Sequence, residues 1–134
     1  RMRTNADITI YNRKYDPKIR GDTWHRTVLK GVHLYCEHKV QLLATGLVNA
    51  DLYKIRVPLN VGTDKRYVPQ RGYQEAGDIS GLWTIQKGDY IVCGIGPEIS
   101  SLKELQKLIT DTCKVTAWSD NRRGGLPHWR IEGV

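Results

Sequence analysis

Apolar side chains recur at every second position in several segments of the chain, which is the period of a half-buried β-strand. Residues 52–58 are the clearest case, because Tyr53, Ile55 and Val57 share one face and basic residues take the other. A long strand is expected over residues 23–35, with a bend at Gly31. Further strands are expected at residues 8–11, 83–85, 90–95, 113–118 and 128–132. A Gln-Lys-Gly-Asp turn separates residues 83–85 from 90–95 and predicts a β-hairpin there.

Other segments carry turn signals or lack a period. Residues 12–22 are turn-rich, and residues 36–50 predict a long excursion, since Gly46 and Asn49 weaken any helix. Residues 59–81 contain Gly, Pro and mixed charges and predict a second long loop. One helix is expected at about residues 101–111, where Ser-Leu-Lys-Glu forms a capping box before an apolar stripe.

These elements predict a mainly β protein. We expect a single domain over residues 1–134, built as a small antiparallel β-barrel or sandwich of about seven strands, with one helix in its C-terminal half and long loops. No stretch approaches the roughly 20 apolar residues that a transmembrane helix needs, and no secretory leader is recognisable, so we expect neither membrane insertion nor secretion.

The charge of the chain favours an anionic partner. The formal net charge is +7, and eleven basic against five acidic side chains lie in residues 1–60. An excess of this kind suits a polyanion or an acidic protein surface, although solubility alone is an equally good explanation.

Candidate catalytic and metal-binding chemistry is weak. His33, Cys36 and His38 lie within six residues, but a zinc site would need a distant fourth ligand such as His25, Cys93, Cys113 or His128. Cys93 and Cys113 lie in apolar runs, where cysteine usually acts as a small core residue. No nucleophile elbow, carboxylate pair or complete dinucleotide-binding loop is present. We therefore expect a protein without enzymatic activity, metal or cofactor.

Nucleic-acid binding is the most credible general function. Basic residues alternate with aromatic ones in several segments, as in barrels that bind single strands. The chain has four Trp, seven Tyr and no Phe, so we expect the Trp side chains to fill the core, while the roles of Tyr67 and Tyr73 stay open. A patch that faces DNA without reading its sequence is possible at Lys54, Arg56, Lys65, Arg66 and Arg71.

The order of the segments resembles an uncharacterised family of small structural proteins from tailed phages and prophages of Gram-positive bacteria. The most specific parts are Gly-x-Trp-Thr-Ile-Gln-Lys-Gly-Asp-Tyr-Ile-Val, at residues 81–92, and the final His-Trp-Arg, at residues 128–130. More remotely, the pattern resembles the head-completion, or stopper, proteins of siphophages. The segments that carry the resemblance are residues 6–12, 24–32, 50–58, 81–92 and 127–131.

The resemblance implies a β-barrel subunit of a ring, taken to be a hexamer, between connector and tail in the phage neck. It implies contacts with connector, adaptor and tail proteins, packaged double-stranded DNA in the lumen, and a virion assembled in the host cytoplasm. In the stopper proteins the loop after the second strand closes the channel; its counterpart by position is residues 36–50. The extra segment 59–81 and the helix depart from that pattern, so either loop could face the channel.

Two sets of site residues follow. The candidates for the channel or DNA are Lys39, Gln41, Thr45, Lys65, Arg66 and Arg71. The candidates for contacts with other subunits or the connector are Arg13, Lys14, Arg20, Arg122 and Arg123. The alternatives are a tail terminator or other minor head–tail component, a nucleic-acid-binding barrel module that ignores sequence, and a small enzyme built on His33, Cys36 and His38.

Overall fold

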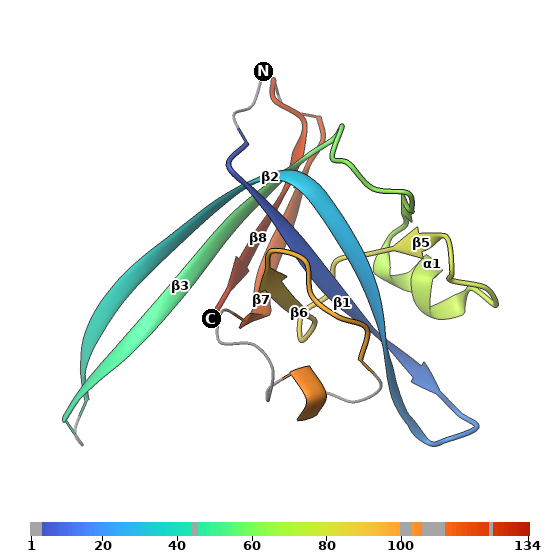
Figure 1. Ribbon diagram of the computed structural model, residues 1–134, viewed down its shortest axis with the longest axis horizontal. Helices are drawn as coiled ribbons and strands as arrows, with labels where there is room; N and C mark the ends of the chain where they lie inside the picture. The colour runs from blue at the N-terminus through green and yellow to red at the C-terminus, as the bar shows by residue number, and fades with distance from the viewer. Residues whose placement is uncertain (1–3, 44–45, 100–102, 106–111, 124) are drawn as a thin grey trace.

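Six strands form the main body of the protein (Figure 1). The computed structural model describes residues 4–43, 46–99, 103–105, 112–123 and 125–134, and residues 37–51 by their backbone alone. The fold is mainly β, as the alternating pattern predicts. The six strands are β1 (Ala6–Asp16), β2 (Gly21–Leu43), β3 (Gly46–Pro58), β6 (Tyr90–Cys93), β7 (Thr112–Asn121) and β8 (His128–Gly133).

The strands pair antiparallel in the order β1-β2-β3-β8-β7-β6, and β6 pairs again with β1, so the ladder closes into a small barrel. The closing seam is short and runs from Ile8 opposite Cys93 to Tyr11 opposite Tyr90. Long β2 pairs with β1 up to Val32 and with β3 from His33 onward. Gly31 has φ +84°, a conformation that glycine adopts readily, and lies at the register shift, which confirms the predicted bend.

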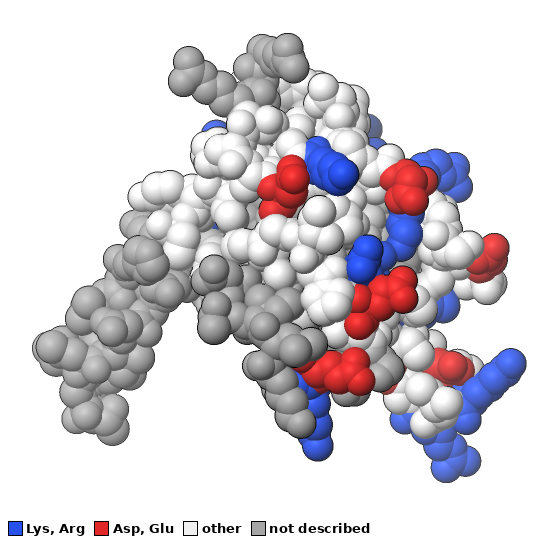
Figure 2. Space-filling model, in the orientation of Figure 1, with Lys and Arg blue, Asp and Glu red and all other residues white. Residues whose placement is uncertain are grey.

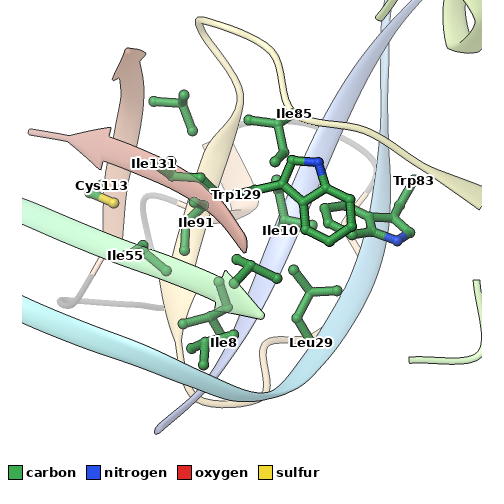
Figure 3. Packing of buried hydrophobic residues seen from close by; sticks show 13 residues of the cluster. Ile8, Ile10, Leu29, Ile55, Trp83, Ile85, Ile91, Cys113, Trp129 and Ile131 are labelled. Carbon is green, nitrogen blue, oxygen red and sulfur yellow. The ribbon is translucent and has the colours of Figure 1, made fainter. Parts of the chain in front are cut away.

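The barrel encloses one hydrophobic core (Figure 3). Every strand of the ring supplies buried side chains to it, because the inward positions of each strand are apolar. Trp83 and Trp129 are buried here, which confirms the expected core role for these two tryptophans. Trp118 packs partly buried against the same core, and Trp24 packs partly buried against a smaller cluster of Tyr11, Val92 and Leu105. The cluster consists of Ile8, Ile10, Leu29, Val32, Ile55, Val57, Trp83, Ile85, Ile91, Cys113, Val115, Trp129 and Ile131.

Two antiparallel ribbons extend beyond the barrel (Figure 1). The β1–β2 arm consists of residues 12–25, in which β1 pairs only with β2. The β2–β3 arm consists of residues 37–43 and 46–52, which lie past the last pair between β3 and β8 and pair only with each other.

The arms correct two predictions. Residues 36–50 form strand almost throughout their described part instead of a long excursion, and the turn-rich stretch at 12–22 narrows to the turn between Asp16 and Gly21. In both places each strand receives its backbone hydrogen bonds from the other strand of its arm, and that pairing outweighs weak side-chain periodicity.

The predicted hairpin over residues 83–95 is wrong. The turn at Gln86 and Asp89 is present, with the Asp89 N–H donating to the Gln86 carbonyl at 3.2 Å. The segments on either side do not pair, because β5 (Leu82–Trp83) pairs parallel with β4 (Arg66–Tyr67), whereas β6 lies between β1 and β7. Buried side chains at Thr84 and Gln86 occupy the connection.

The expected loop at residues 59–81 contains β4 and a short helix, α1 (Gln70–Glu75). No side chain caps its first turn, so the helix depends on tertiary contacts, among them the burial of Tyr73. Of the helix expected at residues 101–111, residues 103–105 are helical, and the rest of that prediction lies outside the described residues. Within the described part, no helix is long and apolar enough to cross a membrane.

Candidate functional surfaces

The cysteine and histidine side chains do not assemble a metal site. No group of three His, Cys, Asp or Glu side chains suited to a metal ion occurs among the described residues. His33 and Cys36 lie on β2, where opposite parity directs their side chains to opposite faces, and the side chain of His38 lies outside the described part. Burial raises the pKa of the Cys113 thiol to about 12, with smaller contributions from Cys93 and Cys36. This thiol is therefore poorly suited to act as a nucleophile.

A buried carboxylate, Asp89, joins the predicted turn to β1. Its Oδ2 accepts a hydrogen bond from Asn12 Nδ2 at 2.8 Å, and its Oδ1 accepts one from the Arg13 backbone N–H at 3.0 Å. Gln86 Nε2 lies 3.2 Å from both oxygens. Burial raises the pKa of Asp89 to about 6 against the opposing effect of these donors. The side chain has no exposed surface, so it serves to fix the backbone and cannot reach a substrate.

Lys14, one of the residues predicted to contact a partner, stabilises α1 within the fold. Its Nζ donates to the backbone carbonyls of Tyr73, Gln74 and Ala76 at 3.1, 2.9 and 3.0 Å. A cation is favourable at the C-terminal end of a helix, where carbonyl groups lack partners. The ammonium group is therefore engaged within the fold.

Replacing Lys14 by Met is expected to lower the free energy of unfolding by about 2 kcal/mol, because three carbonyls lose their charged donor while the aliphatic stem is kept. Urea unfolding measures the loss, and hydrogen exchange should show α1 opening more often. Lys18→Met, on the exposed turn of the β1–β2 arm, is the matched control and should change stability little. Equal stability of the two variants would contradict this role for Lys14.

The other predicted contact residues occupy different surroundings. Arg122 forms an ion pair with Asp120 at 2.7 Å and lies over the rings of Tyr67 and Trp129, 5.3 and 5.4 Å from their centroids. Arg123 is exposed in the turn after β7. The remaining two, Arg13 and Arg20, have exposed side chains on the β1–β2 arm. Figure 2 shows basic side chains at the lower right, where Figure 1 places the end of this arm.

Among the residues predicted to face DNA, the described side chains are those of Lys65, Arg66 and Arg71, and two of them have partners within the fold. Lys65 Nζ donates to the Arg26 carbonyl at 2.5 Å, and burial lowers its pKa. Arg71 pairs with Glu75 at 3.2 Å on α1, and Arg66 is exposed on β4. Tyr67 and Tyr73, whose roles were open, both pack within the fold. Lys39 and Gln41 lie on the backbone of the β2–β3 arm, opposite Ala50 and Val48, and Thr45 lies outside the described residues.

A different basic cluster lies on the outer wall of the barrel. Strand register places His33 of β2 opposite Arg56 of β3, and Arg56 opposite Arg130 of β8. We call these three residues the basic row. The row borders a groove of about 260 Å³ that Tyr35 and Lys54 also line. The alternation of residues 52–58 placed Arg56 outward, but only the register brings it beside the other two.

Exposed apolar side chains gather elsewhere. Ile19 is 63% exposed at the end of the β1–β2 arm, and Tyr15 lies on the same arm. Leu59, just after β3, and Leu126, just before β8, are each about half exposed. Both line a groove of about 410 Å³. Among the described residues, these side chains provide apolar surface at two separate places in addition to the basic row.

Fold and surfaces together define a small antiparallel β-barrel protein with two projecting arms. The chain belongs to a family of unknown function, DUF6751, whose profile matches residues 3–134. No curated protein matches the chain, and no solved structure matches it.

Proposed function

We propose that this protein is a non-enzymatic virion component of a tailed-phage neck, a head-completion subunit that forms a ring between connector and tail and retains packaged DNA. The observation that carries the proposal is the β2–β3 arm. It begins where β3 leaves β8 and extends the barrel by a ribbon that pairs with no other described strand. In the stopper proteins that the chain resembles, the loop after the second strand closes the channel, and the β2–β3 arm is its counterpart by position.

An isolated two-stranded ribbon is only marginally stable in water. The β2–β3 arm runs from the pair Glu37–Leu52 to the pair Leu43–Gly46 without a third strand. A neighbouring subunit that packs against the arm would supply the missing contacts. A ring around a channel provides such a neighbour for every copy and brings the arms of all copies together.

The separate apolar surfaces support the same assembly. A ring requires heterologous contacts, in which one surface of a subunit meets a different surface of the next. Ile19 on the β1–β2 arm and the pair Leu59 and Leu126 offer two such surfaces at distinct places. The hexameric ring and the contacts with connector and tail proteins form part of this proposal.

Deletion of the gene from the phage genome that encodes it, followed by electron microscopy of the lysate, tests the function. We expect empty heads beside finished, unattached tails, and recovery on expression of the wild-type gene in trans. Full heads with malformed or overlong tails would instead support the alternative function, that of a tail terminator. Normal infectious particles would contradict the virion proposal and leave the nucleic-acid-binding module, which the basic row favours.

A variant with a shortened arm makes the test specific. Replacement of residues 39–50 by Asn-Gly joins His38 to Asp51, which already face each other across the two strands, through a favoured two-residue turn. Because the barrel strands are untouched, we expect folding and thermal stability close to wild type. The variant should fail to restore filled heads in the deletion strain. Full complementation by the folded variant would contradict the assigned role of the arm.

A further inference from the structure

We propose that the basic row, His33, Arg56 and Arg130, binds the phosphate backbone of double-stranded DNA. The inference rests on the proposed function, in which DNA passes the protein, and it assigns the contact to the barrel wall. Neighbouring strands lie about 4.8 Å apart, so the row spans roughly 10 Å across β2, β3 and β8.

The register of the row is unfavourable for the free protein. Arg56 and Arg130 face each other directly across adjacent strands, and like charges in this position destabilise a sheet. Arg130 has one carboxylate partner, Glu132, at 2.8 Å. Among the described residues, Arg56 has no ion-pair partner. An anion placed between the two guanidinium groups would remove their repulsion.

The surroundings of the row favour DNA over a protein surface. Protein interfaces bury an apolar core, enriched in aromatic residues and arginine and depleted of other charged residues. Here Tyr35 is the one exposed large apolar side chain among the described residues that lines the groove at the row; the others, such as Ile19 and Leu59, do not line it. The groove at the row is lined by basic side chains, by the buried residue Ile55 and by one exposed aromatic ring, that of Tyr35. Guanidinium and ammonium groups pair readily with phosphate oxygens, which are the commonest hydrogen-bond partners in protein–DNA contacts.

A single exposed ring also argues against a single-stranded ligand, because such sites use successive aromatic side chains as stacking platforms. Tyr35 is the one aromatic residue that lines this groove, and it is 53% exposed. A duplex presents phosphates at a regular spacing to a rigid row of donors and needs no stacking. The row therefore fits double-stranded DNA of any sequence.

The test is the binding of the purified full-length chain to a short DNA duplex of arbitrary sequence, measured by fluorescence anisotropy over a series of salt concentrations. The double variant Arg56→Gln/Arg130→Gln should bind at least about tenfold more weakly at about 50 mM salt, and the salt slope should fall by roughly two. The control Arg66→Gln/Arg71→Gln removes the same charge at β4 and α1 and should bind within about twofold of wild type.

The stability of the row variant separates a binding role from a structural one. The substitution removes a repulsive pair and also the partly exposed Arg130–Glu132 ion pair, which contributes little. The variant should therefore melt close to the wild-type temperature while its affinity falls. Equal weakening in the control pair would indicate general charge attraction and overturn the inference. Unchanged binding of the row variant, or no DNA binding by wild type at low salt, would overturn it as well.

The two experiments can distinguish a failure of the DNA-binding inference from a failure of the proposed neck function. If the row variant loses DNA binding but deletion of the gene leaves particles normal, the inference stands and the neck assignment fails. If wild type does not bind DNA but the row variant fails to restore particles, the neck assignment stands. The row would then serve an acidic protein, and the inference would be overturned.

Discussion

Replacing Trp83 by Ala is expected to lower the free energy of unfolding by about 4 kcal/mol, in the range of large-to-small substitutions of buried aromatic residues. Trp83 is 1% exposed. Its ring contacts Tyr67 and Trp129 edge to face, at centroid distances of 5.1 and 5.4 Å. The Trp83 side chain thus links β5 and its partner β4 to Trp129 of β8 in the barrel core. The substitution would leave a cavity and weaken the attachment of residues 59–83.

Chemical unfolding followed by circular dichroism measures this loss, since the fluorescence of the variant changes with the removed indole. Arg122→Gln is the matched comparison, because it removes the cation above Tyr67 and Trp129 from the exposed side of the same cluster. It should cost less than about 1 kcal/mol. A Trp83→Ala variant no less stable than Arg122→Gln would show that the aromatic cluster does not hold the segment to the barrel.

Strands with one apolar and one polar face can be predicted from the local sequence alone. In residues 52–58 and 128–132, apolar and polar side chains alternate, so the buried face can be assigned without knowing the neighbouring strand. The bend at Gly31 was predictable for a similar reason, since a glycine inside a long strand pattern marks a bulge or a bend. The fold class and the parts of the strands that lie in the barrel follow from such patterns.

The β2–β3 arm could not be predicted from either of its strands taken alone. Residues 36–50 show no period, and their strand state comes from pairing between the two halves of the segment. The basic row has the same origin, because His33, Arg56 and Arg130 are far apart in sequence and meet only through the register of three strands. The patch that the sequence predicts therefore contains Arg56 but neither His33 nor Arg130. It also contains Lys65 and Arg71, which have partners within the fold.

The turn from Gln86 to Asp89 shows a further limit of prediction from local sequence. The Lys-Gly-Asp sequence predicts a tight turn, and Gly88 has φ +90° as such a turn requires. The usual role of an aspartate there is local backbone geometry. In this structure, its carboxylate also binds Asn12 and the backbone of Arg13, more than seventy residues away in the chain. Only the packing of the turn against β1 reveals that contact.

Replacing Asp89 by Ala is expected to destabilise the protein strongly, and more so in acid than near neutral pH. The substitution leaves the Arg13 backbone N–H without its acceptor and takes one acceptor from both Asn12 and Gln86. Unsatisfied buried donors cost about 1–3 kcal/mol each, so we expect a loss of about 4 kcal/mol near pH 4.

The pH dependence follows from the raised pKa of Asp89. The folded protein holds the Asp89 proton up to a pKa of about 6, whereas the ordinary value is 3.8. Between these values the folded state binds more protons than the unfolded state, so this group's stabilisation is complete below about pH 4 and declines as pH rises through about 6. Two pKa units correspond to about 3 kcal/mol. The cost of Asp89→Ala should therefore shrink to about 1 kcal/mol near pH 7.5.

Urea unfolding of wild type and Asp89→Ala across this range measures the difference between the two at each pH. Taking the difference cancels the titration of the other carboxylates, which both proteins share. Asp78→Ala is the control, because this carboxylate lies in an exposed turn where hydrogen bonds from Ser80 lower its pKa. Its cost should vanish as pH falls, opposite in sign to that of Asp89. A cost of Asp89→Ala that grows toward neutral pH would mean that the buried donors outweigh burial and hold the carboxylate ionised.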